Sequence, residues 1–234
     1  MRLLTTFFML GLLTLASISP WSRPHVHAQQ TDPLVAVSTF DTDAEGWTTD
    51  ADARCRPTPC YAATGGNPGG YIYSDDTLQG IKFYYNAPAK FLGNVSNAYH
   101  KNLTFDMQQS ARDIVETDDI DVILEGAGLR LVFDTSRNPP RLWFSYNVPL
   151  DESTGWHKDT LTGRQPTAAE MKAVLGSLTR LAIRGDYIFG QATSSLDNVV
   201  LGAPPIIEGE VYEIFLPLVR TSRSFTVYLP LIQK

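Results

Sequence analysis

A carboxylate and an amide, Asp197 and Asn198, stand next to a run of aliphatic residues in the stretch TSSLDNVVL. The β-branched residues of this stretch predict a strand. Strict alternation along that strand places Asp197 on the same face as Val199 and Leu201. A carboxylate beside an apolar face is costly to bury unless it is compensated. The residues leave two partners open: a cation such as Arg184, or the N–H groups of a neighbouring turn.

Acidic clusters raise the question of general acid–base catalysis on glycosidic bonds, which needs two carboxylates about 5–10 Å apart. Each cluster borders a predicted strand, where acidic side chains usually lie in solvated turns. The sequence contains no nucleophile elbow, zinc-protease helix or phosphate-binding glycine loop. An enzyme acting on glycans is therefore the least favoured interpretation, and no catalytic residue is predicted. The clusters are Asp75-Asp76, Asp118-Asp119-Ile120-Asp121 and Asp151-Glu152.

The two cysteines, Cys55 and Cys60, close the short segment CRPTPC. In a protein exported to an oxidising compartment this spacing predicts a disulfide across a tight loop. Loop entropy gives such a short ring about 2 kcal/mol of stabilisation. A zinc site is the alternative, but it needs two more ligands. His100 and His157, the only histidines beyond residue 28, do not stand at ligand spacing.

Aromatic side chains can stack on the apolar faces of sugar rings. Tyr84, Tyr85 and Trp143 are the favoured candidates for a platform of this kind. Because most aromatic residues of a β-sandwich belong to its core, core packing is the alternative explanation for each of these residues. Further candidates are Tyr71, Tyr73 and Trp156.

The tripeptide Arg184-Gly185-Asp186 is the one found in integrin ligands. Its recognition requires an exposed loop tip, whereas Leu181 and Ile183 predict a buried strand leading into it. We interpret the tripeptide as a chance occurrence.

The elements that position these residues are mostly short strands. In NLTFDMQQ, Leu103, Phe105 and Met107 face one way and the polar residues face the other. DIDVILEG, GLRLVFD and RLAIRG alternate in the same manner, and turn clusters such as TGGNPGG and SRNPP separate the strands. The pattern predicts an all-β fold, an antiparallel two-sheet sandwich.

One helix is expected within PTAAEMKAVLGSL. Thr167 followed by Glu170 fits a capping box, which satisfies free N–H groups at a helix start. Met171, Val174 and Leu175 then recur at helical spacing and form an apolar stripe. We expect this short helix to cap one end or side of the sandwich.

The ends of the chain predict export and a separate tail. Residues 1–28 combine a cation, an apolar stretch and the small residues of Val26-His27-Ala28, as in a cleaved secretory signal peptide. An uncleaved anchor is the alternative, and no later stretch is long and apolar enough to cross a bilayer. Residues 29–201 then form the sandwich domain. Residues 202–234 form a Pro-containing tail whose LPL motif repeats in IFLPLV and VYLPLI, which fits edge docking and surface retention equally well.

The charge of the chain bears on its partners. The formal net charge is −6 and becomes −8 when Arg2 and Arg23 leave with the signal peptide. Nucleic acids and anionic membranes need clustered cations, so both are disfavoured. A composition of 43% hydrophobic and 19% charged residues is that of a globular chain. We expect a secreted or cell-surface protein whose partner is an extracellular polysaccharide or a surface or matrix protein.

Several segments in a fixed order resemble the laminin B domain, also called laminin IV type A. They run from about Phe83 to Leu201 and include APAKFLGNVSNAY, NLTFDM, DVILEGAGLRLVF, WFSYNVPLDESTGW, LTRLAIRGDY and SLDNVVL. The resemblance implies a jelly-roll sandwich of the galactose-binding type. In animal matrix proteins this module is a structural globule without catalytic residues.

The resemblance also implies a third partner for Asp197. Many related sandwiches hold a structural calcium ion between an acid after the first strand and an aspartate in the last one, and these positions match Asp41 and Asp197. Calcium takes six to eight oxygen ligands. We therefore expect a non-catalytic structural or adhesive module with a structural calcium ion. A carbohydrate-binding module is the alternative.

Overall fold

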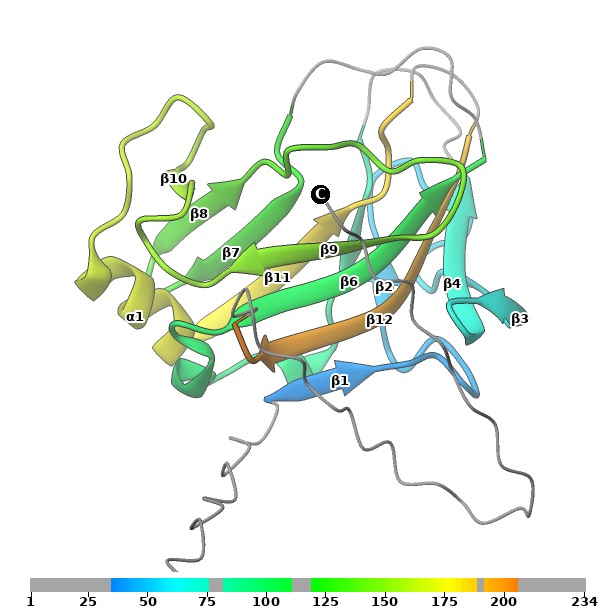
Figure 1. Ribbon diagram of the computed structural model, residues 1–234, viewed down its shortest axis with the longest axis horizontal. Helices are drawn as coiled ribbons and strands as arrows, with labels where there is room; N and C mark the ends of the chain where they lie inside the picture. The colour runs from blue at the N-terminus through cyan, green and yellow to red at the C-terminus, as the bar shows by residue number, and fades with distance from the viewer. Residues whose placement is uncertain (1–34, 76–81, 111–118, 189–191, 206–234) are drawn as a thin grey trace, which may run out of the picture. The chain divides into compact units, whose positions relative to one another are not determined.

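Two antiparallel sheets of six strands each pack face to face (Figure 1). The structure is a computed structural model that describes residues 35–75, 82–110, 119–188 and 192–205, all within one compact unit of the chain. The two sheets and a short helix confirm the predicted all-β, antiparallel sandwich. The predicted signal peptide and the LPL repeat of the tail lie outside the described residues, and both stay predictions.

The first sheet is built around its longest strand. Its strands are β1 (Ala36–Ser38), β3 (Cys60–Gly66), β4 (Gly69–Asp75), β6 (Asn102–Gln109), β9 (Phe144–Pro149) and β12 (Thr193–Ala203). Their order is β3-β4-β12-β6-β9, with β1 also paired to β12. Along one side, β12 pairs first with β4 and then with β1; along its other side it pairs with β6. β12 therefore changes neighbour halfway along its length.

The second sheet has the order β10-β8-β7-β11-β5-β2. Its strands are β2 (Thr48–Thr49), β5 (Tyr84–Asn86), β7 (Val122–Gly126), β8 (Leu129–Phe133), β10 (His157–Lys158) and β11 (Leu178–Arg184). The remaining elements are helix α1 (Ala168–Gly176) and the 3-10 turns η1 (Ala89–Phe91) and η2 (Ser96–Ala98).

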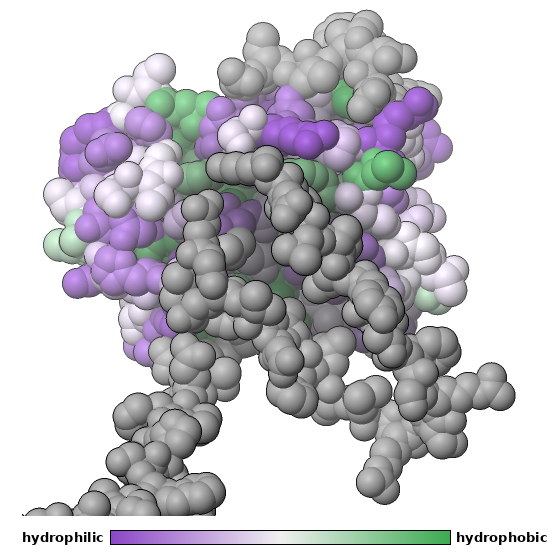
Figure 2. Space-filling model, viewed as in Figure 1, coloured by the Kyte–Doolittle hydropathy of each residue, from purple (hydrophilic) through white to green (hydrophobic). Residues whose placement is uncertain are grey.

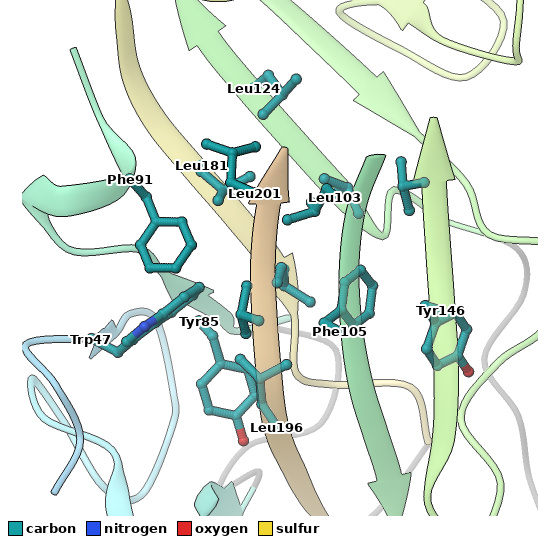
Figure 3. Close-up of a cluster of buried hydrophobic side chains, with 14 of the residues drawn as sticks. Trp47, Tyr85, Phe91, Leu103, Phe105, Leu124, Tyr146, Leu181, Leu196 and Leu201 are labelled. Carbon is teal, nitrogen blue, oxygen red and sulfur yellow. The ribbon is translucent and has the colours of Figure 1, made fainter. Parts of the chain in front are cut away.

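The core lies between the two sheets. Leu103, Phe105 and Met107 of β6 all point into it and are almost fully buried, which confirms the alternation predicted for this strand. Figure 3 shows side chains of both sheets converging there, with Trp47 and Phe91 at one side. Each fully buried side chain of this size contributes about 1.5–3 kcal/mol of hydrophobic stabilisation.

Helix α1 begins with the predicted capping box. The Glu170 N–H donates to Thr167 Oγ1 at 3.3 Å, and the Thr167 N–H donates to the Glu170 carboxylate at 2.9 Å. Val174, on the apolar stripe of the helix, is buried. A Cβ atom at Gly126 would lie 2.6 Å from the Val174 carbonyl oxygen, so glycine lets β7 approach the helix this closely.

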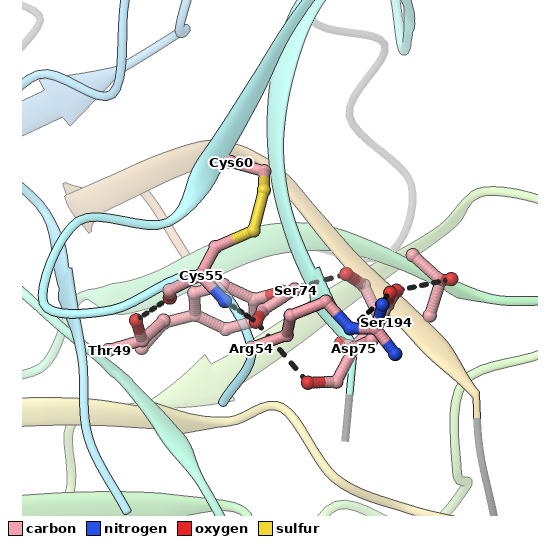
Figure 4. Close-up of a disulfide and its surroundings, with 9 residues drawn as sticks. Thr49, Arg54, Cys55, Cys60, Ser74, Asp75 and Ser194 are labelled. Carbon is pink, nitrogen blue, oxygen red and sulfur yellow. Dashed lines mark hydrogen bonds and ion pairs between the residues drawn. A yellow bond between two sulfur atoms is a disulfide. The ribbon is translucent and has the colours of Figure 1, made fainter. Parts of the chain in front are cut away.

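The predicted disulfide is present between Cys55 and Cys60, whose Cα atoms are 5.4 Å apart (Figure 4). The Cys55 N–H donates to Ser74 Oγ at 3.2 Å, and Arg54 forms an ion pair with Asp75 at 3.4 Å. These contacts fasten the disulfide loop to β4.

β12 does not alternate strictly, and one sequence prediction is wrong for that reason. Asp197 lies opposite Asp106, but the next pair in register is Val200 with Thr104, so β12 carries one extra residue here. This is a β-bulge, which reverses the faces of all residues that follow it. Val199 therefore points into the core, whereas Asp197 lies on the outer face of the sheet.

Candidate functional site

A polar network surrounds Asp197 where β12 changes neighbour. Although Asp197 lies on the outer face of the sheet, the turn between β3 and β4 covers it, and its side chain is fully buried. The Asn67 N–H donates to Asp197 Oδ2 at 2.6 Å, and the Asn198 N–H donates to Oδ1 at 2.7 Å. The partners of this carboxylate are thus two backbone N–H groups, one from the β3–β4 turn and one from β12. Arg184 is paired instead with Asp121.

Asp106 belongs to the same network, although sequence reasoning did not single it out. Its Oδ2 accepts hydrogen bonds from the side-chain amides of Asn67 at 3.0 Å and Asn198 at 2.8 Å. The Asn198 amide also donates to the Asn67 carbonyl oxygen at 2.6 Å. The sequence signal was available, because Asp106 stands between Phe105 and Met107 at an outward-facing position.

The side chain of Asn198 reaches both partners because its backbone is left-handed, with φ of 48°. Asparagine adopts this conformation more readily than most residues. The turn also packs closely against the carboxylate, since a Cβ atom at Gly66 would lie 2.6 Å from Asp197 Oδ2.

Burial, together with the negative charges of Asp106 and Asp41, raises the pKa of Asp197 to about 6 against the lowering effect of the two N–H donors. Asp41 lies at the same turn, because its Oδ1 is 2.9 Å from the position of a Cβ atom on Gly69. Asp41 and Asp197 both lie close to the β3–β4 turn. Among the described residues, however, no three histidine, cysteine or acidic side chains form a group able to hold a metal ion.

The predicted aromatic platform is not formed by Tyr84, Tyr85 and Trp143. Tyr85 is fully buried in the core and its hydroxyl donates to the Ser194 carbonyl oxygen at 2.7 Å, so its assignment to a ligand surface is wrong. Tyr84 lies on the second sheet, where its hydroxyl donates to the Ile120 carbonyl oxygen at 2.9 Å. Trp143 precedes β9 of the first sheet.

Trp143 instead joins two aromatic residues of β4. Its ring lies edge-on to Tyr71 with 5.5 Å between centroids, and Tyr71 lies 5.7 Å from Tyr73. The Trp143 Nε1–H donates to the Gly65 carbonyl oxygen at 2.9 Å, which fixes its orientation. All three rings are partly exposed, and we call Tyr71, Tyr73 and Trp143 the aromatic strip. Tyr73 pairs with Ser195 of β12, so the strip borders a polar sheet surface.

The surface around these groups is mainly polar. In the view of Figure 1, Figure 2 shows hydrophilic and intermediate residues over most of the coloured surface, with small hydrophobic patches between them. Among the described residues, Leu142 is the exposed large hydrophobic side chain, at 78% exposure. No described helix has the length and hydrophobicity needed to span a membrane.

The acidic clusters have local partners wherever the structure describes them. In the part of the chain that the structure describes, these carboxylates form ion pairs with nearby cations. The pairs are Asp75 with Arg54, Asp119 with Lys82, Asp121 with Arg184, and Asp151 with His100.

The Arg184-Gly185-Asp186 tripeptide is buried. Arg184 is fully inaccessible and Asp186 is 3% exposed. The Arg184 Nε–H donates to the Asp186 carbonyl oxygen, and the guanidinium lies 4.6 Å from the Tyr187 ring centroid. This burial supports the interpretation of the tripeptide as a chance occurrence.

Comparison with known proteins adds sequence relatives. The chain is 32% identical over 184 residues to laminin subunit gamma-1 of Xenopus tropicalis, an alignment that covers 72% of this chain and 10% of that protein. The chain thus spans about a tenth of the length of the curated relative it matches.

Solved structures match at lower identity. The L4b domain of human laminin alpha-2 is 12% identical with a TM-score of 0.48, and the match covers 61% of this chain and 95% of that one. An exo-beta-agarase is 13% identical with a TM-score of 0.50, over 73% of this chain and 25% of that one. The second match concerns the fold alone.

The profile of the family Laminin B (Domain IV) matches residues 84–203, more than half of the chain. The matched region begins at β5 and ends with β12, so it contains five of the six strands of the second sheet, three of the six strands of the first, and the Asp106–Asp197 pair. With the gamma-1 relative, this match shows that the chain belongs to the Laminin B (Domain IV) family.

Proposed function

We propose that this protein acts as a non-catalytic structural or adhesive module outside the cell. The family match over residues 84–203 carries the proposal. The disulfide between Cys55 and Cys60 supports an extracellular location, because such bonds persist in oxidising compartments. The local ion pairs of the acidic clusters support a non-catalytic role, because a paired surface carboxylate is poorly placed to exchange protons with a substrate.

The test uses the full chain and a set of neutral and acidic polysaccharides. We expect no release of reducing ends from any of them, measured over a range of pH and protein concentration. Hydrolysis that scales with protein concentration and is lost in an Asp151→Asn or Asp119→Asn variant would show that the protein is an enzyme.

A second candidate function, binding of neutral polysaccharide, is favoured by the aromatic strip. Tyr71, Tyr73 and Trp143 are partly exposed, lie within 6 Å of their neighbours and border polar side chains of the same sheet. Stacked aromatic rings beside hydrogen-bonding groups are typical of sugar-binding surfaces. This function needs Trp143, whereas a purely structural module does not.

An assay of how strongly the chain is retained on neutral glucans distinguishes the sugar-binding function from a purely structural one. If the strip binds sugar, Trp143→Ala abolishes retention of the chain, while Leu142→Ala, which removes an exposed neighbouring side chain outside the strip, leaves it unchanged. Absence of retention for the unmodified chain would leave the structural or adhesive role as the function.

We also propose a structural calcium ion at the β3–β4 turn, held by Asp41 and Asp197 with Asp106 beside them. Support comes from the negative charges of Asp106 and Asp41, which add to burial in raising the pKa of Asp197 and which a divalent cation would offset. Binding requires Asp41 to turn towards Asp197, since the described side chains do not yet form a metal-binding group. Calcium would contribute charge neutralisation there.

A further inference from the structure

An open pocket of about 470 Å³ lies beside β9, the edge strand of the first sheet. The segment after β8 and the segment after β9 form its other walls. The pocket is separate from the Asp197 network and from the aromatic strip, whose residues do not line it. Its volume lies within the range of small-molecule sites.

The Tyr146 hydroxyl is an unpaired polar group at this pocket. The side chain is 5% exposed and lines the pocket, and within the part of the chain that the structure describes its hydroxyl has no hydrogen-bond partner. Figure 3 shows this hydroxyl pointing away from the other labelled core side chains. Buried polar groups in proteins are almost always hydrogen-bonded, so an unpaired one indicates a missing partner.

The ring that carries this hydroxyl is held on two sides. It stacks on Phe105 with 5.1 Å between centroids and an interplanar angle of 14°, and Phe144 lies edge-on at 5.1 Å. Burial raises the pKa of Tyr146, so the phenol stays neutral and can donate its proton.

Arg137 supplies a cation at the rim of the same pocket. Its guanidinium lies 4.7 Å from the Phe144 ring centroid, and the side chain is exposed. Among the described residues, no acidic side chain forms an ion pair with it; Asp134 also lines the pocket and has an interaction of its own. A planar guanidinium of this kind matches a carboxylate through two parallel hydrogen bonds.

Two further features of the pocket are held in place by contacts outside it. Phe133 lines the pocket and packs against Trp156 with 5.2 Å between centroids. The loop that follows β8 is anchored where Thr135 donates its N–H to Asp121 Oδ2 at 3.0 Å. The pocket is therefore preformed, which lowers the entropy cost of binding.

We propose that this pocket binds a hexuronate, a pyranose ring with a carboxylate, as one unit of an acidic polysaccharide. The carboxylate pairs with Arg137, the Tyr146 hydroxyl donates to a ring or hydroxyl oxygen, and the sugar ring packs on Phe133 and Phe144. The inference rests on the proposed adhesive role and deepens it, because it names the class of polymer to which the module adheres.

The experiment titrates the full chain with methyl β-D-glucuronide and, separately, with methyl β-D-glucoside, by calorimetry or NMR. The two ligands differ only at the carboxylate, so we expect the glucuronide to bind about tenfold or more tightly. Arg137→Gln should remove this preference. Tyr146→Phe, which deletes only the hydroxyl, should weaken glucuronide binding about fivefold.

Two variants serve as controls. Arg141→Gln makes the same charge change on the same loop, at a guanidinium that donates to the Ser110 carbonyl oxygen outside the pocket, and should leave binding unchanged. Trp143→Ala should also leave it unchanged, which separates this site from the aromatic strip. Thermal melting of each variant verifies that it is folded.

The proposal is overturned if neither sugar binds or if both bind equally. It is also overturned if Tyr146→Phe binds the glucuronide like the unmodified chain, because the hydroxyl is then satisfied by water alone. Loss of binding in Trp143→Ala but not in Arg137→Gln would assign the ligand to the aromatic strip instead. Failure of the proposed non-catalytic function would appear as hydrolysis of polysaccharide. Failure of the pocket proposal would appear as absent or unselective glucuronide binding, so the two failures are distinguishable.

Discussion

Asp197 and Asp106 lie opposite each other on β12 and β6, and both carboxylates accept hydrogen bonds from Asn67 of the β3–β4 turn and from Asn198 of β12. The pair lies where β12 leaves β4 and begins to pair with β1. At such a junction the backbone ladder is interrupted, and the side-chain network joins the turn to the sheet in its place. This arrangement makes the network a determinant of stability and the proposed location of calcium.

The first prediction concerns the pH dependence of stability. The pKa of Asp197 is about 6 in the folded protein, above its ordinary value of 3.8, so the folded state binds this proton more tightly than the unfolded state. The contribution of Asp197 to stability should therefore increase as the pH falls from about 7 to 4, by about 2 kcal/mol. Urea unfolding at several pH values in the presence of a chelator measures it.

Asp197→Asn should remove this contribution from the pH profile. Asp159→Asn is the matched control, because Asp159 is exposed and its backbone has a positive φ of 63°, which asparagine tolerates. A profile of the same slope in Asp197→Asn and in the unmodified chain would show that Asp197 does not titrate in this range.

The second prediction tests the proposed calcium ion. If calcium binds only the folded state, a concentration of 100 times its dissociation constant adds about 2.7 kcal/mol to the free energy of unfolding. The melting temperature in millimolar calcium should then exceed that in chelator by several degrees. Asp41→Asn and Asp197→Asn should both reduce the shift, and magnesium should reproduce little of it. An unchanged melting temperature in calcium would eliminate the site.

The third prediction concerns the bulge residue Asn198. Asn198→Ala loses the side-chain hydrogen bonds to Asp106 and Asn67. Alanine also adopts the left-handed backbone with φ of 48° less readily than asparagine. The two effects together should lower the free energy of unfolding by about 2–3 kcal/mol. Asn198→Gly loses the same bonds without the backbone penalty and should cost about 1 kcal/mol less. Denaturant unfolding compares the two variants. Equal losses would mean that the left-handed conformation contributes nothing to the difference.

The fourth prediction concerns the buried ion pair of Arg184 and Asp121, whose atoms Nη1 and Oδ1 are 3.6 Å apart and whose side chains are fully inaccessible. Arg184→Met leaves a buried carboxylate without its cation and should cost about 3–5 kcal/mol. The double variant Arg184→Met with Asp121→Asn should recover part of this loss, because the carboxylate that had lost its cation is then neutral. A double-mutant cycle measures the coupling, and additive losses would show that the two side chains do not stabilise each other.

The sequence was sufficient to predict those elements whose interacting residues lie close together in the chain. Leu103, Phe105 and Met107 alternate over one strand, and Thr167 and Glu170 form a cap within one helical turn. The five-residue separation of Cys55 and Cys60 likewise made the disulfide predictable. In each case the interacting residues are close in the chain, so their geometry follows from the period of a helix, a strand or a short loop.

The orientation of Asp197 and the exposure of the aromatic residues required the tertiary structure. Alternation alone placed Asp197 with Val199, but the bulge reverses this, and the bulge lies where β12 changes its partner strand. Tyr85 belongs to the core because β5 packs in the second sheet, which no residue near it in the chain reveals.

The sequence by itself thus determined the all-β class, the helix cap, the disulfide and the family resemblance. Only the tertiary structure decided which acids share one turn, which aromatic rings form the strip, and that Tyr146 and Arg137 meet at one pocket. The physical reason is that register and sheet order join residues far apart in the chain, and these depend on the packing of the whole sandwich.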